Sequence, residues 1–246
     1  MRDGGPASVW LVRHGESTGN VAREVAESGG AELIDLAERD ADVPLSDHGR
    51  RQAAALGRWF AELPAAERPT HALSSPYRRA HDTAVEALAG LPSVPLRVDE
   101  RLRDRELGIL DLLTTAGVMA RYPDEAARRR RLGKLYHRPP GGESWADVAL
   151  RLRAVLAELT VDRPGGRVVL FTHEAPIFLA RYIIEELSEV ELLDVARATT
   201  LANCSLTRYE RAADGALHLE EFNATSMLER DGAQPTQEPG VRAEPV

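Results

Sequence analysis

The chain has 246 residues, which fits one large domain or two small ones. Hydrophobic residues make up 43% of it, enough for a sizeable core, and its net charge of -8 argues against binding nucleic acid through a broad basic face. The single cysteine, Cys204, excludes an intrachain disulfide, and no apolar run reaches the ~20 residues of a membrane-spanning helix. We therefore expect a cytoplasmic protein that binds neither nucleic acid nor membrane.

Short apolar runs alternate with longer helical patterns in the first half of the chain, which is typical of an α/β fold. Ser46 is a good N-cap for the first predicted helix, and Pro64 closes that helix. Three strands are predicted here, at residues 8–12, 71–73 and 95–98. The first helix, residues 47–62, lies between the first two strands. A second helix, capped and opened by Ser74-Ser75-Pro76, lies between the last two.

The second half continues the same pattern. Ser144 is predicted to cap a helix with a core stripe of six residues at helical spacing: Trp145, Val148, Leu152, Val155, Leu156 and Leu159. Residues 167–172 form the clearest buried strand, which ends at His173. Residues 204–209 and 217–222, separated by a turn that contains Gly215, are predicted to form a hairpin.

One basic segment, residues 121–138, stands in this otherwise acidic chain. It contains four consecutive arginines, Arg128 to Arg131, followed by Lys134 and Arg138. Four consecutive helical side chains point in every direction, so they cannot all face one ligand. The segment is therefore either a solvated face or a positive lid over an anionic substrate.

Two histidines directly follow buried strands, His14 after the first and His173 after the fourth. Because ligands bind at the carboxyl ends of strands in an open parallel sheet, both side chains could lie over one crevice. Arg13 precedes His14, and Arg78 and Arg79 follow another strand at a helix start. Guanidinium groups match the geometry of phosphate oxygens. The sequence therefore predicts a phosphate pocket at this edge of the sheet.

The run Leu11-Val12-Arg13-His14-Gly15-Glu16-Ser17-Thr18-Gly19-Asn20 resembles the signature of the histidine phosphatase superfamily, which includes cofactor-dependent phosphoglycerate mutases. Further segments resemble the family in the same order, at residues 45–53, 74–84, 102–108, 142–144 and 172–173. Residues 134–153 are most similar to the fructose-2,6-bisphosphatase branch. The resemblance covers about residues 8–228 and so nearly the whole chain.

This resemblance implies a three-layer α/β/α fold with a mixed, mostly parallel sheet, and a histidine phosphatase domain over residues 1–228. Residues of about 112–143 lie between the expected acid and the Gly-Glu-Ser turn, and their composition differs from the elements on both sides. We expect them to form a helical cap beside the active site. Residues 229–246 are rich in Pro, Gly and Glu and are predicted to be a disordered tail.

The resemblance also implies a role for each matching residue. His14 would be the nucleophile that becomes phosphohistidine. The groups that bind the transferring phosphoryl group would be Arg13, Arg79 and His173. Asp104 matches the acidic proton donor, which is Glu in many members of the family. Glu106, two residues further on, is the alternative acid, because it would share the face of Asp104 in an extended segment.

On the substrate side, Asn20 would contribute a donor at the edge of the pocket. Lys134 and Arg138 align with basic positions that the fructose-2,6-bisphosphatase branch uses on its substrate. Extra positive charge there would favour substrates with a second anionic group. Arg78 is the alternative to Arg79 in the phosphate pocket, although Arg79 directly precedes Ala80 as in the family pattern.

These roles predict a metal-independent phosphomonoester hydrolase that acts on a small phosphorylated metabolite and needs no cofactor. A histidine nucleophile must be neutral, and neighbouring cations favour this by lowering its pKa. Phosphoryl transfer depends mainly on positioning and cationic stabilisation. A phosphoglycerate mutase and a non-catalytic phospho-ligand binder are the rival interpretations. The physiological substrate and the oligomeric state, a homodimer included, stay open.

Overall fold

One mixed sheet organises residues 4–237, the part of the chain that the computed structural model describes. Six strands lie there in the order β3-β2-β4-β1-β5-β6. Their bounds are Ser8–Arg13 for β1, His71–Ser74 for β2, Leu96–Val98 for β3, Arg167–Thr172 for β4, Leu206–Arg211 for β5 and Leu217–Ala224 for β6. The first four strands pair in parallel, and β5 pairs antiparallel with both β1 and β6. The predicted α/β class with a mixed, mostly parallel sheet is confirmed.

Side-chain alternation along the central strands divides the core between the two faces of the sheet. On β1, Val9 and Leu11 belong to one hydrophobic cluster, whereas Trp10 and Val12 belong to the other. The parallel register places Val9 beside Val168 of β4, which belongs to the same cluster as Val9. Both faces of the sheet are therefore buried, which is why the central strands are continuous apolar runs in the sequence.

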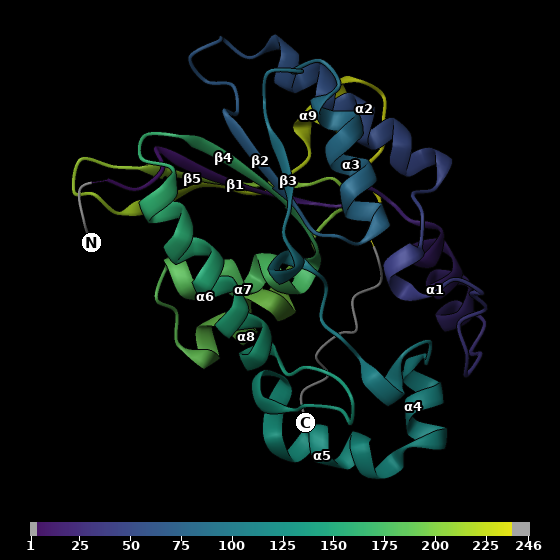
Figure 1. The fold of residues 1–246 in the computed structure, drawn as a ribbon. Helices are drawn as coiled ribbons and strands as arrows, with labels where there is room; N and C mark the ends of the chain where they lie inside the picture. Colours follow the sequence, from purple (N-terminus) through teal and green to yellow (C-terminus); the bar gives the residue numbers. More distant parts are fainter. Residues whose placement is uncertain (1–3, 238–246) are drawn as a thin grey trace.

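Helices cover both faces of the sheet and give three layers (Figure 1). One face carries α2 (Asp47–Glu62), α3 (Arg78–Leu88) and the short α9 (Ser226–Arg230). The other carries α6 (Trp145–Asp162), α7 (Glu174–Ile184) and α8 (Glu189–Ala198). None of the helices in the described range combines the length and apolar character that a membrane crossing requires.

Helix starts show where local sequence decides the fold. Helix α2 has the predicted bounds, and its N-cap Ser46 accepts a hydrogen bond from the backbone N–H of Gly49 at 2.9 Å. Helix α3 differs from the prediction, because its N-cap is Tyr77 and it begins at Arg78. The hydroxyl of Ser75 instead accepts from the backbone N–H of Tyr77 at 3.1 Å, within the turn that precedes the helix.

The segment at residues 112–143, which we call the cap, stands apart from the three layers in Figure 1. It contains α4 (Thr115–Arg121) and α5 (Pro123–Tyr136). An antiparallel bridge between Leu33 and Leu113 connects the cap to the segment that follows α1 (Thr18–Ser28). Three single-turn 3-10 helices complete the described elements: η1 (Asp40–Asp42), η2 (Glu100–Leu102) and η3 (Gly108–Leu110).

The predicted disordered tail is wrong for residues 229–237. Asp231 forms an ion pair with Arg58 at 2.7 Å, and Ala233 is buried. The backbone N–H of Asn203 donates to the carbonyl of Thr236 at 2.8 Å. Polar partners on α2 and on the loop before β5 therefore hold a segment whose composition alone favours disorder. The remainder of the predicted tail, residues 238–246, lies outside the described residues.

Candidate active site

The carboxyl ends of β1 and β4 bring His14 and His173 together. The two strands are neighbours, and the backbone N–H of His14 donates to the carbonyl of Thr172 at 3.0 Å. The two imidazole ring centroids lie 5.1 Å apart, and both side chains are buried. This position, beyond the ends of parallel strands, is where open α/β sheets bind ligands.

The turn that carries His14 is held by α2 and α3. The backbone N–H of Gly15 donates to the hydroxyl of Thr83 at 3.0 Å. A Cβ on Gly49 would lie 1.9 Å from the carbonyl oxygen of Glu16, so only glycine allows α2 to approach the turn this closely. The Gly49 of the sequence motif is therefore a packing requirement that fixes the backbone next to His14.

The hydrogen bonding of His14 determines which ring nitrogen is available for reaction. Its Nδ1 lies 2.8 Å from the carbonyl oxygen of Gly15. Because a carbonyl can only accept, Nδ1 carries the proton in this contact. The lone pair of the neutral ring is then on Nε2, which gives His14 a nucleophilic nitrogen.

Both histidines are held in the neutral form. Burial is the largest cause that lowers the pKa of His14 well below its usual value, followed by the charges of Arg79, His173 and Arg13. Burial also lowers the pKa of His173, with further contributions from Arg79, Arg151 and Arg13. Desolvation and neighbouring cations both disfavour imidazolium. Two neutral imidazoles next to buried guanidinium groups are therefore what this site offers a ligand.

Of the two candidate arginines on α3, the structure places Arg79 in the site. Arg79 and Arg13 are both buried and line the same cavity as His14. The side chain of Arg78 is 54% exposed and pairs with Asp82 at 3.5 Å. The alternative in which Arg78 replaces Arg79 is therefore wrong. The first turn of α3 turns one of these neighbouring side chains inward and the other outward.

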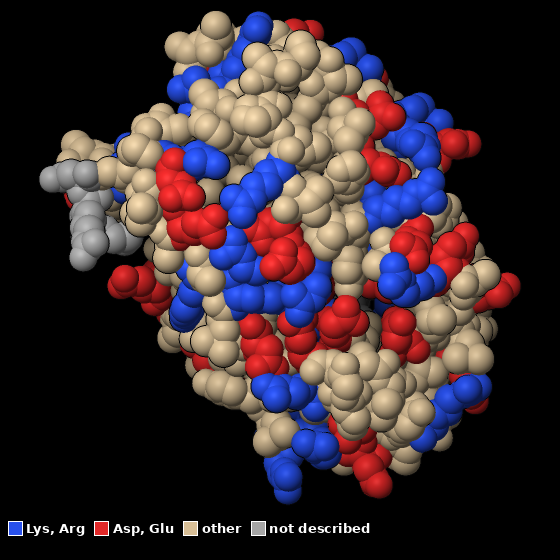
Figure 2. Space-filling model, viewed as in Figure 1, with Lys and Arg blue, Asp and Glu red and all other residues tan. Residues whose placement is uncertain are grey.

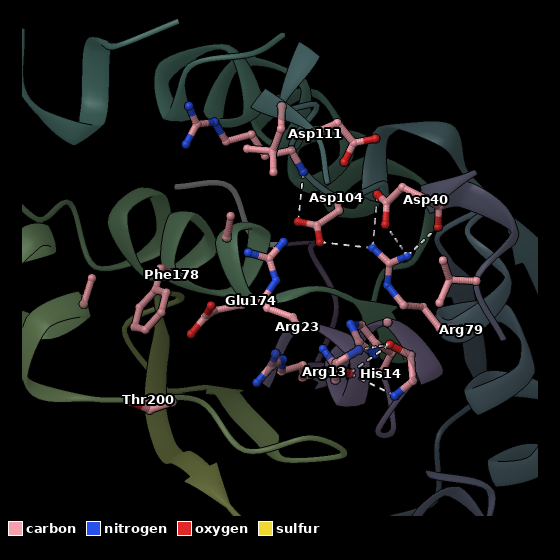
Figure 3. A pocket seen from close by; sticks show the side chains of 18 of the residues that line it. Arg13, His14, Arg23, Asp40, Arg79, Asp104, Asp111, Glu174, Phe178 and Thr200 are labelled. Carbon is pink, nitrogen blue, oxygen red and sulfur yellow. Dashed lines mark hydrogen bonds and ion pairs between the residues drawn. The ribbon is translucent and has the colours of Figure 1, made fainter. Parts of the chain in front are cut away.

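Of the two candidate acids, the structure places Asp104 in the site (Figure 3). Its Oδ2 lies 3.3 Å from Nη2 of Arg79 and 3.5 Å from Nδ1 of His173. Glu106 is exposed and accepts a hydrogen bond from the phenol of Tyr77 at 2.6 Å. Only the carboxyl of Asp104 is therefore next to both a phosphate-binding candidate and a histidine.

The Gly-Glu-Ser motif contributes a residue whose function sequence reasoning did not identify. Glu143 accepts hydrogen bonds from Nε and Nη2 of Arg151, both at 3.0 Å. Arg151 in turn donates to the backbone carbonyls of Arg103 at 2.9 Å and Asp104 at 3.0 Å. A pair of charged side chains at the start of α6 therefore fixes the backbone that carries Asp104. The motif was visible in the sequence, but its link to Asp104 through Arg151 was not.

Arg13, His14, Arg79 and Asp104 line one cavity of about 420 Å³. Its walls also include Asn20 from α1, Lys134 and Arg129 from the cap, and Phe178 from α7. Asn20 Oδ1 accepts from the backbone N–H of Ser17 at 2.9 Å, which caps α1. A cavity of this size is in the range of small-molecule sites.

The four consecutive arginines separate into two groups. Arg129 lines the cavity, whereas Arg128, Arg130 and Arg131 are exposed. Arg128 pairs with Glu125 at 3.1 Å on the helix surface. The basic segment is thus mostly a solvated face that places one arginine over the cavity.

Arg138 does not reach the cavity, so its predicted substrate contact is wrong in this structure. Its side chain is 63% exposed and forms an ion pair with Asp147 on α6. Gly133, with φ of 76°, interrupts the helix, and the chain after it runs beside the start of α6. Lys134 remains over the cavity, where its ammonium lies 4.3 Å from the centre of the Trp145 ring.

Three cations on this side of the cavity, Lys134, Arg105 and Arg129, all have a lowered pKa. Burial is the largest cause for each, lowering the pKa of Lys134 to about 8, that of Arg105 to about 10, and that of Arg129. The charge of Arg129 further lowers the pKa of both Lys134 and Arg105, while Glu174 raises that of Lys134. Arg105 donates its hydrogen bonds to backbone carbonyls, at 2.6 Å to Glu143 and 3.3 Å to His137. This wall of the cavity is therefore rich in positive charge.

Charges of both signs also mark the outside of the molecule. Figure 2 shows Lys and Arg interspersed with Asp and Glu on the face that it presents, without a single broad basic surface there. Within residues 4–237, no group of three or more His, Cys, Asp or Glu side chains has the arrangement to hold a metal ion.

A neutral histidine, two buried arginines and a carboxyl around one cavity, with a second buried imidazole beside the first, define a site for a phosphoryl group on a three-layer α/β fold. Residues 9–225 match the model of the histidine phosphatase superfamily (branch 1). The chain therefore belongs to this family.

Relatives in this family include both phosphatases and mutases. The chain is 31% identical over 95% of its length to a 2,3-bisphosphoglycerate-dependent phosphoglycerate mutase from Gloeobacter violaceus, of which it covers 96%. It is 35% identical over 66% of its length to the glucosyl-3-phosphoglycerate phosphatase of Mycobacterium tuberculosis, of which it covers 68%. The solved complex of mycobacterial glucosyl-3-phosphoglycerate phosphatase with inorganic phosphate is similar with a TM-score of 0.67 and 28% identity, over 90% of this chain and 99% of that one.

Proposed function

We propose that the protein is a metal-independent phosphomonoester hydrolase that acts on a small phosphorylated metabolite through a phosphohistidine at His14. The observation that carries the proposal is the state of His14: a buried neutral imidazole whose Nδ1 is held by the Gly15 carbonyl, in a cavity with Arg13, Arg79 and Asp104. This arrangement supplies a nucleophile, cations for the phosphoryl oxygens and a proton donor.

In the first step, Nε2 of His14 attacks phosphorus and the ester P–O bond breaks, with its electron pair going to the leaving oxygen. Protonated Asp104 donates a proton to that oxygen, so the alcohol leaves neutral. Arg13, Arg79 and His173 donate hydrogen bonds to the phosphoryl oxygens, where negative charge accumulates in the transition state. Cationic stabilisation from the chain itself supplies the charge that many phosphatases obtain from metal ions.

In the second step, the carboxylate of Asp104 removes a proton from a water molecule that attacks phosphorus. The P–N bond breaks, its electron pair returns to Nε2 of His14, and phosphate leaves. Asp104 is protonated again and His14 is neutral, so the site has returned to its starting state. One carboxyl group serves both half-reactions, as expected when the two steps attack the same phosphorus.

Hydrolysis requires water at the phosphohistidine, whereas a mutase must exclude it. The cavity extends from His14 to Trp145 and Phe178, which leaves room for water beside a small ligand. The likeness to a mycobacterial phosphatase at 35% identity supports the same choice. The mutase with 31% identity over nearly the whole chain keeps phosphoglycerate mutase as the alternative.

The proposal is tested with an aryl phosphate in excess chelator, comparing wild type with His14→Ala. We expect activity to survive the chelator and to vanish with the substitution, together with an acid-labile phosphoenzyme. His218→Ala is the matched control, because His218 is exposed on β6 and pairs with Asp214. Activity that disappears with chelator, or that remains in His14→Ala, would contradict the mechanism.

The alternatives give different products. With 3-phosphoglycerate, efficient isomerisation with little release of phosphate would identify a mutase. The absence of a trapped phosphoenzyme with every ester tested, together with measurable binding of phosphate, would identify a non-catalytic binder of phosphorylated ligands.

A further inference from the structure

Asp40, which belongs to none of the sequence motifs, has its carboxylate in contact with the guanidinium of Arg79. Asp40 belongs to the 3-10 helix η1, which packs against the start of α3. Nη1 of Arg79 donates to the backbone carbonyl of Asp40 at 2.7 Å and to its Oδ1 at 2.9 Å. Nη2 of Arg79 contacts Oδ2 of Asp40 at 3.4 Å. Asp40 also lines the cavity, so its charge lies beside the place of a bound phosphoryl group.

Arg79 is consequently shared between two carboxylates. Its guanidinium points toward Asp40 and Asp104 in Figure 3, and its Nη2 lies 3.3 Å from Oδ2 of Asp104. The two contacts of Nη1 have good hydrogen-bond lengths, whereas the contacts of Nη2 at 3.3 and 3.4 Å are long. The Nη2 contacts are therefore the ones that a phosphoryl oxygen replaces at least cost, while Nη1 stays with Asp40.

A phosphoryl dianion at Arg79 would then be the third acidic group around one guanidinium. Like charges within a few ångströms in a partly buried site cannot all stay ionised, and a proton on one of them relieves the repulsion. Asp104 already needs a proton to act as the acid. Asp40 is the other carboxyl in contact with Arg79, and its side chain is 42% exposed, so water can deliver a proton to it.

We propose that Asp40 is a positioning residue that holds Arg79 through Nη1 and takes up a proton when a phosphoryl dianion binds, so that phosphoryl binding weakens as the pH rises. The inference rests on the proposed function only in requiring that a phosphoryl group bind at Arg79. Asp40 does not contact either histidine of the site, so it acts on the reaction through Arg79.

The surroundings of Asp40 raise its pKa, as the proposed uptake of a proton requires. Burial raises the pKa of Asp40, and the charge of Arg79 lowers it. The carboxylates of Asp104 and Asp111 raise it further, and the phenol of Tyr77 is another titratable neighbour. The net result is a raised pKa before any ligand binds. A bound dianion adds one more negative charge and raises it again.

The test is calorimetric titration of the full chain with inorganic phosphate, in buffers of different ionisation enthalpy and at several pH values. Wild type is compared with Asp40→Asn, which keeps the size of the side chain and removes its charge. Near neutral pH we expect Asp40→Asn to bind phosphate about two- to fivefold more tightly. We also expect it to take up fewer protons on binding than wild type, by up to about one proton. The titration of phosphate itself is common to both proteins and cancels.

Two further variants make the comparison specific. Asp42→Asn removes a charge from the same 3-10 helix, where Asp42 is exposed and pairs with Arg39 at 2.9 Å, and should behave as wild type. Asp40→Glu keeps the charge and should restore proton uptake. Tighter binding in Asp40→Asn cannot result from misfolding.

Equal affinity and equal proton uptake in wild type and Asp40→Asn would overturn the inference and leave the proposed function intact. Weaker binding by Asp40→Asn would mean that Asp40 only orients Arg79, and would also overturn the charge linkage. If wild type does not bind phosphate at all, the proposed function fails together with the inference.

Discussion

Lys134, the only lysine of the chain, lines the cavity, where its charge can act on the choice of substrate. Burial lowers its pKa to about 8, so its charge changes within the working range of most enzymes. We propose that Lys134, with Arg105 and Arg129, attracts a second anionic group of the substrate. The KM for a sugar bisphosphate should then rise about two- to fivefold between about pH 7 and pH 9, because Lys134 is charged below its pKa and neutral above it. The KM for an aryl phosphate without a second anionic group should change less.

The variant Lys134→Met isolates this effect. It should raise the KM for the bisphosphate at pH 7 and remove most of the change between pH 7 and pH 9. Arg138→Met is the matched control, because Arg138 pairs with Asp147 outside the cavity. An equal response of both substrates to Lys134→Met would show that the basic wall does not select for a second anion.

Single residues were predictable where they sit in a motif next to a strand. His14, Arg13, Arg79 and His173 are all found at the site that the sequence indicated. Asp40 was not predictable, because it comes from a 3-10 turn between α1 and α2 that carries no motif. Its place depends on how that turn packs on α3, which only the three-dimensional structure shows.

At the scale of elements, the start of α6 controls the position of the acid. Arg151 joins Glu143 to the backbone carbonyl of Asp104, and its side chain is only 10% exposed. We expect Arg151→Met to lower kcat about ten- to a hundredfold with a small change in KM, because a displaced acid weakens the transition state more than the ground state. The loss should be larger for an alkyl phosphate than for a nitrophenyl phosphate, whose leaving group needs no proton.

This difference between leaving groups separates a positioning role from a general loss of stability, which would affect both substrates equally. Arg153→Met is the matched control on the same helix, since Arg153 is exposed and lies over the ring of Tyr182. A uniform loss of activity for both substrates in Arg151→Met would refute the link to Asp104.

Elements whose ends carry a local sequence signal, such as a capping residue, were predicted well, and other elements were not. Helix α2 has a capping serine and an amphipathic pattern, and its predicted bounds, Asp47 to about Glu62, agree with the structure. Helix α7 follows β4 directly and is apolar through Pro176 to Ala180, so its pattern merges with that of the buried strand. The 229–237 segment was mistaken for disorder because its partners lie on α2 and before β5. Long-range contacts of this kind leave no local signal.

At the scale of the whole molecule, the sheet is packed between two hydrophobic cores, and this packing fixes the strand ends that carry the site. Each core covers one face, and the chain beyond the ends of β1 and β4 reaches the cavity between α3, α7 and the cap. The alternation of strands and helices was enough to predict this class of fold. The place of the cap relative to the sheet was an expectation, and Arg129 and Lys134 now put its α5 at the wall of the cavity. The fold therefore converts two ordinary strand ends into a site with buried histidines and arginines.

Burial of the two histidines lowers the free energy of unfolding by an amount that depends on pH. The pKa values of His14 and His173 are lowered in the folded protein, chiefly by burial. Between those lowered values and the unfolded-state pKa of about 6.5, the unfolded chain binds more protons than the folded one. The free energy of unfolding therefore rises with pH in this window and falls as the pH drops below about 6.5. The slope reaches about 1.4 kcal/mol per pH unit for each histidine.

Urea unfolding between about pH 7.5 and pH 5.5 measures this dependence directly. We expect wild type to lose stability over that range, and His173→Gln to lose less, because one buried imidazole no longer has to be kept neutral. His218→Gln should follow wild type, since His218 is exposed and forms an ion pair with Asp214. A free energy of unfolding that stays constant from pH 7.5 to pH 5.5 would mean that the buried histidines titrate normally. Nucleophile activation by burial would then have to be abandoned together with the stability prediction.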